Sequence, residues 1–254
     1  VVARSFPAFF RTDTMGSYEE GSGRLAFARE LTRPENPLTA RVWANRVWLF
    51  VMGQPLVDTP SDFGLATPRP KQLALLDHLA QVLVKEGWST KALIRHIMTS
   101  DAWARETVVA AKTLARDPEN RLFARGELRR KSLEGWRDAV LWVRGDQDSR
   151  VAGRPKDLED LTMRRRTLYG RIERQNLPGL FRAFDYPDPY GHSARRAVTV
   201  TPNQALTFLN SPFVVSASKR LGGRARESDE PVRALGRWIY GRDLADAELG
   251  EAAA

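Results

Sequence analysis

The chain contains no cysteine. Disulfides, thiolate nucleophiles, cysteine-ligated zinc and covalently attached c-type haem are therefore excluded within these 254 residues. Long hydrophobic runs are also missing. The longest, from Val47 to Met52, falls far short of the ~18–20 residues that a transmembrane helix needs, so no transmembrane segment is predicted. The sequence also lacks a Gly-rich phosphate loop, a nucleophile elbow and a His-Glu-x-x-His zinc motif. These absences argue against an enzyme more than for one.

Charge is abundant and unevenly distributed. The net charge is +9, and residues 121–196 alone hold 18 Lys/Arg against 11 Asp/Glu. Such a surplus attracts acidic polysaccharide, anionic lipid or nucleic acid. Nucleic acid is disfavoured because no recognisable nucleic-acid-reading module is present. The simpler interpretation, which we favour, is a solvated basic face whose arginines partly pair with acids.

Helix starts recur with one chemistry, a capping side chain directly before proline. The cap accepts a backbone N–H that has no partner within the helix, and proline at the first helical position needs no donor. These pairs are Asn36-Pro37, Asp117-Pro118, Thr201-Pro202 and Ser211-Pro212. Four such starts predict a mainly helical protein.

Apolar periodicity predicts further helices. Their ranges are 37–52, 70–86, 90–100, 133–144, 231–240 and 244 onward, with two more after Pro202 and Pro212. In 133–144 the residues expected to face inward are Leu133, Trp136, Val140 and Val143. Weak alternation marks 167–172 as the best strand candidate. The predicted fold is mainly α, an irregular multi-helix array with one short β element near 167–172.

The predicted core of this array gathers tryptophan side chains. They are Trp43, Trp48, Trp88, Trp136 and Trp238. We expect residues 1–30 to be an amino-terminal extension or linker from a longer protein. Residues 31–254 would form a single helical domain, within which lobes at 31–116 and 117–254 are conceivable.

Two kinds of polar side chain fall on predicted helices. Asn45 lies on an apolar face, where an amide usually satisfies the backbone of a neighbouring loop. His78 and His96 are single histidines on amphipathic helices. We expect both to be partly exposed and to hold no ligand.

The segment 185–192 is the sharpest enzymatic candidate. Asp185, Asp188 and His192 could ligate a divalent metal or serve as acid and base. Alternatively, the two aspartates make Asx turns beside prolines and pair with Arg182, Arg195 or Arg196. The prolines favour the turns, so no catalytic residue and no metal site is assigned.

Polar residues flank that segment, a cluster before it and two arginines after it. Guanidinium groups bind carboxylate or sulfate with two hydrogen bonds, and amides add orientation. The predicted binding residues, for an anion or a glycan, are Arg171, Arg174, Gln175, Asn176, Arg195 and Arg196. Alternatively, and in our view preferably, these arginines hold Glu173, Asp185 and Asp188 in an internal polar network.

Several motifs, in order, resemble one family. They are GSGRLAFARELTRPENPLTARVWANRVW at 21–48, DTPSDFG at 58–64, LLDHLAQVLVKEGWSTKALIRHIMTS at 75–100, DPENRL at 117–122, SLEGWRDAV at 132–140 and nearly all of 167–215. The chain resembles the domain of unknown function 1553 family, the carboxy-terminal module of planctomycete-type exported proteins that are often cytochrome-c-associated. The resemblance implies an exported location, periplasmic or at the cell surface, and the other domains of the same polypeptide as partners. It implies no cofactor in this chain, although a neighbouring domain could hold haem. It supplies no catalytic residue.

Three functions follow from these observations. The leading hypothesis is a non-catalytic scaffold or binding module of a larger exported protein. The second is a metal-assisted hydrolase or polysaccharide-acting enzyme that uses residues 171–196. The third is an electrostatic binder of acidic polymers, for example an acidic polysaccharide.

Overall fold

A computed structural model of the chain describes residues 6, 7, 18 and 21–253. The described residues are mainly helical, which confirms the predicted fold class. They divide into two compact units, 1–129 and 130–254, each of which is described by itself. Throughout the described ranges no helix is both long and apolar enough to cross a membrane, since even the longest have 14 residues.

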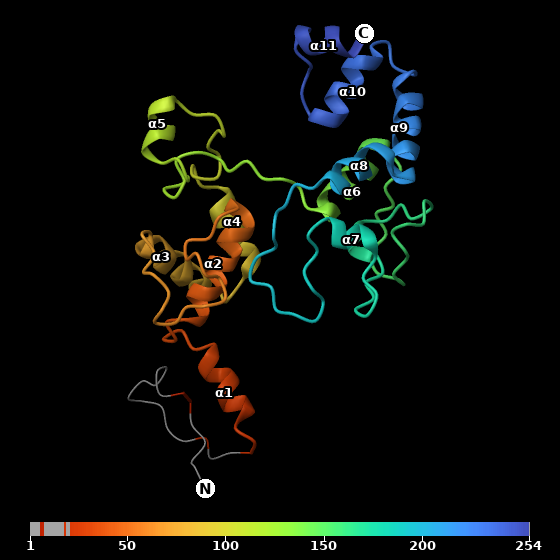
Figure 1. Ribbon diagram of the computed structural model, residues 1–254. Coiled ribbons are helices and arrows are strands. Elements are labelled where there is room, and N and C mark those ends of the chain that lie inside the picture. Colours follow the sequence, from red (N-terminus) through yellow and green to blue (C-terminus); the bar gives the residue numbers. More distant parts are fainter. Residues whose placement is uncertain (1–5, 8–17, 19–20, 254) are drawn as a thin grey trace. The chain divides into compact units, whose positions relative to one another are not determined.

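Unit 1 is built on three helices that pack against one another, α2, α3 and α4 (Figure 1). Its helices are α1 (Arg24–Leu31), α2 (Thr39–Met52), α3 (Leu73–Lys85), α4 (Thr90–Met98) and α5 (Ala111–Arg116). Leu76, Leu79 and Leu83 of α3 are buried in the shared core. Ala40 and Ala44 are buried on the facing side of α2. Small side chains let helix backbones approach closely, so this unit has a tight three-helix centre.

Asn45 of α2 is completely buried, and its amide holds the loop that follows the helix. Its Oδ1 accepts the backbone N–H groups of Leu56 (2.8 Å) and Val57 (2.9 Å), and its Nδ2 donates to the Val57 carbonyl (3.2 Å). These three bonds satisfy loop backbone groups that water cannot reach. The role predicted for Asn45 is therefore confirmed.

Of the four predicted cap–proline helix starts, two are confirmed, at Thr201-Pro202 and Ser211-Pro212. At Asn36-Pro37 the Asn36 Oδ1 accepts the N–H groups of Leu38 (3.0 Å) and Thr39 (3.3 Å), but α2 begins two residues later than predicted, at Thr39 with Leu38 at its N-cap. Thr201 forms a capping box with Gln204, and Ser211 accepts the N–H of Val214 at 3.2 Å. Each of these contacts satisfies a donor of the first turn that the helix itself leaves unpaired.

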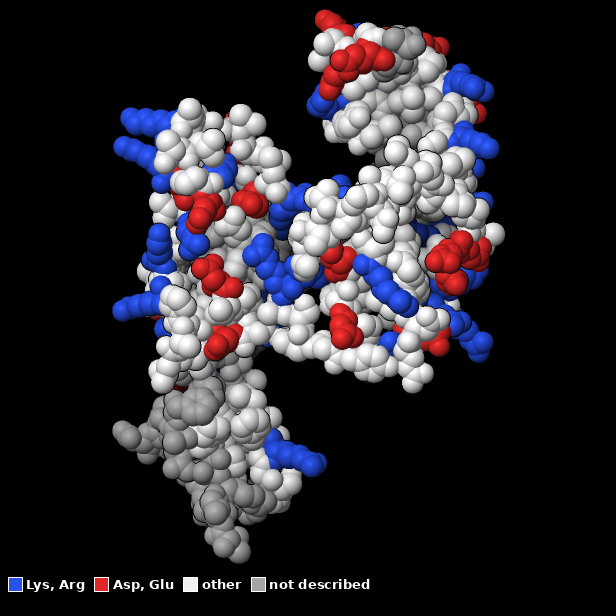
Figure 2. Space-filling view, in the orientation of Figure 1, with Lys and Arg blue, Asp and Glu red and all other residues white. Residues whose placement is uncertain are grey.

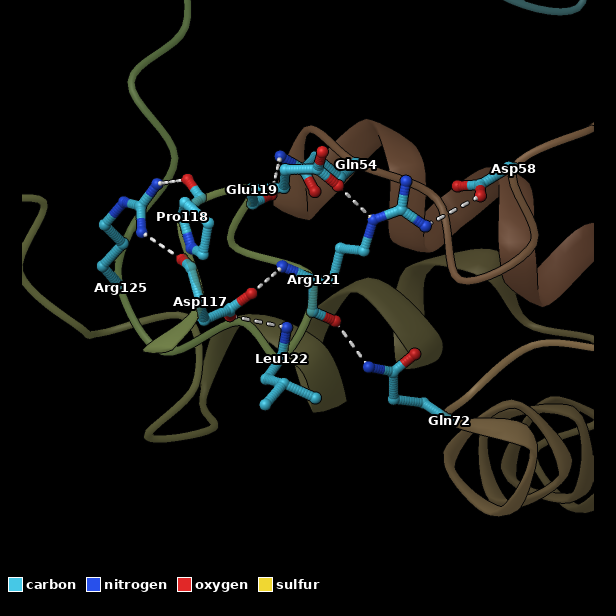
Figure 3. Close-up of polar contacts among 9 residues, drawn as sticks. All are labelled: Gln54, Asp58, Gln72, Asp117, Pro118, Glu119, Arg121, Leu122 and Arg125. Atoms are coloured by element: carbon cyan, nitrogen blue, oxygen red, sulfur yellow. Dashed lines mark hydrogen bonds and ion pairs between the residues drawn. The ribbon is translucent and has the colours of Figure 1, made fainter. Parts of the chain in front are cut away.

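The fourth start, Asp117-Pro118, is wrong. Asp117 Oδ1 and Oδ2 accept the N–H groups of Arg121 and Leu122, both at 2.8 Å, but the chain forms turns there instead of a helix (Figure 3). Asn120 and Phe123 both have φ of 52°, which a right-handed helix does not allow. The same cap chemistry thus closes a loop.

This loop is tied to distant segments of unit 1 by its polar groups (Figure 3). Gln72, just before α3, donates to the Arg121 carbonyl at 2.5 Å, and Gln54, just after α2, donates to the Glu119 carbonyl at 3.3 Å. Arg121 forms ion pairs with Glu119 (2.5 Å) and Asp58 (3.4 Å). The motif at 117–122 therefore has a structural role, because it joins the segment that follows α2 to the segment that precedes α3.

Unit 2 consists of helices joined by long irregular segments (Figure 1). They are α6 (Leu133–Arg144), the 3-10 helix η2 (Thr167–Tyr169), α7 (Gly179–Ala183), α8 (Pro202–Asn210), α9 (Pro212–Ala225), α10 (Pro231–Tyr240) and α11 (Asp246–Ala253). Helix α9 packs against α6, α8 and α10, and α11 packs against α10. Among the described residues, the buried apolar cluster of this unit contains Leu133, Leu158, Met163 and Phe181, with partly buried aromatic rings around it. Leu141, Ala217 and Ala225 are buried outside this cluster. Much of this unit must therefore be held together by polar contacts.

The predicted strand at 167–172 is replaced by η2 and isolated bridges. Lys156 pairs with Gly170 and Asp148 with Arg165, both in parallel, and no sheet forms among the described residues. The reason lies in α6: the carboxylate of Asp138 accepts the Thr167 N–H at 2.6 Å and its hydroxyl at 2.7 Å. The Asp138 side chain thus pairs with the Thr167 backbone N–H, which in a sheet would pair with a neighbouring strand.

The tryptophans do not share one core. Trp48 is 3% exposed, whereas Trp43 is 42% exposed, and Trp88, Trp136 and Trp238 are partly buried. The Trp43 indole N–H donates to Thr90 Oγ1 at 2.9 Å. Its ring therefore lies at the rim, because its polar edge binds the start of α4.

Candidate functional site

Of the two carboxylates of the enzymatic candidate, Asp188 makes the predicted Asx turn, whereas Asp185 binds a segment 14 residues further along the chain. Asp185 has φ of 58°, and its carboxylate accepts the N–H and the hydroxyl of Thr199, each at 2.8 Å. The hydrogen bond from the Thr199 amide is the main reason why the pKa of Asp185 lies below its ordinary value. Asp188 Oδ1 accepts the Tyr190 N–H at 2.9 Å, which is an Asx turn.

Two of the three arginines expected to pair with these aspartates are engaged elsewhere. Arg196 Nη1 lies 2.8 and 2.9 Å from the two carboxylate oxygens of Glu134, and Arg182 donates to the Leu177 carbonyl at 2.9 Å. Across the residues that the structure describes, no three imidazole or carboxylate side chains form a group suited to a metal ion. Asp185, Asp188 and His192 are thus not gathered into such a centre.

The residues predicted to bind an anion or glycan lie at the surface. All six are exposed, namely Arg171, Arg174, Gln175, Asn176, Arg195 and Arg196. Arg171 forms an ion pair with Glu173 at 2.8 Å, two residues along the chain. Of the internal network that we preferred, the Arg171–Glu173 pair forms, but it lies at the surface and is not internal.

The buried guanidinium groups of unit 2 are instead those of Arg137, Arg144 and Arg165. Arg137 is 1% exposed and donates to the carbonyls of Met163 (2.5 Å) and Arg165 (3.1 Å). Burial lowers its pKa, while the charge of Asp138 acts in the opposite direction. Arg137 therefore joins α6 to the irregular 163–167 segment.

Asp146 is a second centre of this polar core. Its carboxylate is 2.9 Å from Arg144, 3.5 Å from Arg164 and 3.4 Å from Arg220. Both Arg144 and Asp146 are almost completely buried, so their pair is screened little by solvent.

Sequence reasoning missed this core because it placed the wrong face of α6 inward. The buried residues are Leu133, Arg137, Leu141 and Arg144. They recur at helical spacing, which is the available signal, but two of them are charged and the apolar pattern ignores charge. The predicted inward set, with Trp136, Val140 and Val143, is rotated by about one residue, or ~100° on a helix.

A pocket with a volume of about 750 Å³ opens beside Arg165, and we call it the basic pocket. Its lining is Asp146, Asp148, Arg150, Val151, Ala152, Gly153, Arg154, Lys156, Thr162, Met163, Arg164 and Arg165. Five of these residues are cationic and two are acidic. The pocket is therefore strongly positive.

Arg165 gives the basic pocket its shape. It donates to the carbonyls of Arg150 (3.2 Å), Ala152 and Arg154 (3.4 Å), and its guanidinium lies 3.8 Å from the centre of the Tyr169 ring. The loop can wrap around this side chain because Ala152 and Gly153 have positive φ. The wall of the pocket is thus fixed by contacts to one side chain.

The two acids of the basic pocket already have partners. Arg150 binds Asp148 with two parallel bonds, Nε to Oδ1 at 3.0 Å and Nη2 to Oδ2 at 2.6 Å. These bonds from Arg150 lower the pKa of Asp148 to about 2, so it is ionised at neutral pH. In the described part of the chain Arg154 and Lys156 form no ion pair, which leaves their charges available to a ligand.

A second hollow, which we call the aromatic groove, has a volume of about 690 Å³. Trp142, Trp238 and Arg224 are among its lining residues. Trp142 is 73% exposed, while the face of Trp238 is covered by Arg224 at 3.9 Å. Along 145–149, alternate residues line the two hollows: Asp146 and Asp148 the basic pocket, and Gly145, Gln147 and Ser149 the aromatic groove. The two sites therefore share one wall.

These observations define a mainly helical protein with an arginine-stabilised second unit that carries a basic pocket. Residues 23–254 match the family described as "Protein of unknown function (DUF1553)", and the chain belongs to this family, as the order of its motifs predicted. Among curated proteins and solved structures, none matches the chain.

Proposed function

We propose that the chain is a binding module and that unit 2 binds an acidic polysaccharide in the basic pocket. The observation that carries this proposal is the arrangement of charge. Five cationic side chains line one pocket, its two carboxylates are held by arginines, and Arg154 and Lys156 form no ion pair with the described residues. Such a site prefers a carboxylate or sulfate group to a cation or a neutral ligand.

The two free cations would act differently on the ligand. The Arg154 guanidinium matches the two oxygens of a carboxylate or sulfate, whereas the Lys156 ammonium is a compact charge that adapts its direction. In the aromatic groove, the exposed Trp142 offers a flat apolar face to a sugar ring, with polar atoms of Gln147 and Ser149 nearby in the same lining. A polymer that spans the shared wall would use both.

One of the binding residues predicted from the sequence, Arg171, adjoins this site through the backbone. The Arg171 N–H donates to the Lys156 carbonyl at 2.7 Å, and the Lys156 N–H donates to the Tyr169 carbonyl at 3.1 Å. Arg171, Arg174, Gln175 and Asn176 would therefore extend the positive surface from the rim of the basic pocket. This supports a polymeric ligand over a single sugar.

The resemblance stated above supports a context of a larger exported protein. Any covalently bound c-type haem would belong to another domain of that protein, because the chain has no cysteine. Fractionation of cells that express the full-length protein tests this location, and recovery in the cytoplasm alone would contradict it.

Affinity electrophoresis in gels that contain polygalacturonate tests the ligand class. The variant Arg154→Glu/Lys156→Glu should bind at least ~10-fold more weakly than the unmodified chain, because it reverses both free charges of the pocket. The control Lys219→Glu/Arg226→Glu makes the same charge change at exposed positions of unit 2 outside the pocket lining. It should stay within about twofold.

Equal losses in the two variants would show that only net charge matters and would overturn the pocket assignment. Release of reducing ends from the polymer, abolished by Asp185→Asn, Asp188→Asn and His192→Ala together, would instead support the polysaccharide-acting enzyme.

A further inference from the structure

Two histidines that are far apart in the sequence meet on the surface of unit 1. His78 belongs to α3 and His96 to α4, and their Nε2 atoms are 3.2 Å apart. The ring centres are 5.3 Å apart and the ring planes are tilted by 48°. The histidines that the sequence presents as isolated are therefore neighbours.

The backbone around both imidazoles is anchored. Leu79, next to His78, and Ile97, next to His96, are 2% and 1% exposed in the core of unit 1. The turn between α3 and α4 is short and ends at Ser89, whose hydroxyl accepts the Ala92 N–H at 3.2 Å. The two helices thus hold the imidazoles on a fixed support.

The distance between the two nitrogens suits a chelated metal ion. An ion ~2.0–2.1 Å from each nitrogen sets them ~3.3 Å apart in tetrahedral geometry and ~2.9 Å apart at neighbouring octahedral positions. The observed 3.2 Å lies between these values. The same nitrogen of each ring faces the other, so an ion that replaces the shared proton would lie to one side of the line between the two nitrogens. Rotations of the two exposed rings would direct both lone pairs toward it.

We propose that His78 and His96 form a two-histidine site for a divalent transition ion, namely Cu²⁺, Ni²⁺ or Zn²⁺. Imidazole suits these ions, whereas Mg²⁺ and Ca²⁺ require oxygen ligands. Within the described ranges no third histidine or carboxylate completes a metal cluster. The remaining positions of the ion would be open to water or to a ligand from outside the chain.

The composition makes the test clean. The chain has three histidines and no cysteine, so His192 is the one remaining imidazole and the matched control. Isothermal titration of the full chain, free of any affinity tag, with CuCl₂ should give one site. His78→Ala and His96→Ala should each weaken it at least ~10-fold, whereas His192→Ala should change it less than about twofold. MgCl₂ should give no heat above dilution.

Electron paramagnetic resonance gives a second readout. The Cu²⁺ spectrum of the unmodified chain should show two nitrogen ligands, and either single variant should show one. Both imidazoles are exposed, and circular dichroism verifies that the variants fold. Binding that survives in both single variants, or that is lost in His192→Ala, would overturn the proposal. The polysaccharide experiments use unit 2 residues, so the two proposals can fail separately.

Discussion

In unit 2, buried arginines hold helices and irregular segments together, a role that apolar side chains have in most protein cores. The buried guanidinium of Arg137 donates hydrogen bonds to backbone carbonyls. It also lies 5.1 Å from the centre of the Phe213 ring. Its Nε has no hydrogen-bond partner among the described residues. Burying a charge is costly unless hydrogen bonds compensate it, so these contacts decide whether the residue stabilises the unit.

Arg137→Ala should destabilise unit 2 by about 3 kcal/mol, because it leaves the Met163 and Arg165 carbonyls without donors and opens a cavity. Native-state hydrogen exchange of the α6 amides measures this free energy. Arg174→Ala, at an exposed position of the same unit, should change it by less than ~0.5 kcal/mol. A loss of under ~1 kcal/mol for Arg137→Ala would show that the carbonyls find other donors.

Asp148 should titrate far below the ordinary range of aspartate. Its pKa is lowered from 3.8 to about 2 by hydrogen bonds from Arg150. Because the folded pKa is depressed, this pair stabilises the fold fully above pH 3.8, and the contribution is lost as the pH falls through about 2. Carbon-13 NMR of the carboxyl group should show the midpoint near 2 and its return toward 3.8 in Arg150→Gln. An unshifted midpoint in the unmodified chain would contradict the Arg150–Asp148 contact.

At the scale of helices, glycines report how closely neighbouring segments approach. Gly236 is buried in the middle of α10, and a Cβ there would overlap the side chain of Leu244. Gly223 lies within α9, and a Cβ there meets no atom within 4 Å. One substitution therefore has opposite expected effects in two adjacent helices.

Gly236→Ala should destabilise unit 2 by about 2 kcal/mol, since either Leu244 or α10 must shift. Gly223→Ala should stabilise it by about 0.5–1 kcal/mol, because alanine loses less backbone entropy in a helix and fits the free space. Urea unfolding of the two variants side by side checks both signs. Stabilisation by both variants would show that helix propensity alone, without the Leu244 contact, sets the result.

The helices themselves were predictable, because caps and apolar spacing are local signals. The predicted 133–144 and 231–240 ranges coincide with α6 and α10, while α1, α5 and α7 were missed. These three are short helices without a side-chain cap, and an isolated short helix has little propensity to form by itself. Asp117 shows the limit of local reading, since its cap chemistry is present but the backbone turns away.

The basic pocket was beyond local reading for a different reason. Its lining comes from 146–156 and 162–165, which are joined by three hydrogen bonds from Arg165 to carbonyls of the facing loop, by the Asp148–Arg165 bridge and by the Arg164–Asp146 ion pair. The sequence did show a surplus of arginine in this third of the chain. It could not show which arginines are consumed inside the fold and which remain for a ligand, because that depends on contacts between distant residues.

At the scale of the whole molecule, many of the basic side chains lie close to acidic side chains. On the face shown in Figure 2, Lys and Arg side chains lie between Asp and Glu side chains in both units. Ion pairs such as Arg41–Asp77 (2.6 Å) and Arg242–Glu248 (2.7 Å) neutralise part of the charge locally. The net charge of +9 therefore acts as a weak general attraction, on which the basic pocket adds a local one.

The attraction due to the net charge and that due to the basic pocket should both weaken with salt, whereas the proposed contact between a sugar ring and Trp142 should not. Exposed charges are screened over ~8 Å at physiological ionic strength, whereas stacking on an aromatic face is not electrostatic. The affinity of the full chain for polygalacturonate should thus fall at least ~10-fold between ~50 and ~200 mM NaCl. The loss caused by Arg154→Glu/Lys156→Glu should shrink over the same range, while the loss caused by Trp142→Ala should keep its size. Affinity electrophoresis at graded salt measures the affinity of the full chain and of both variants.

If the Trp142→Ala effect also vanished with salt, the aromatic groove would have no part in sugar binding, and the polymer would be held by charge alone.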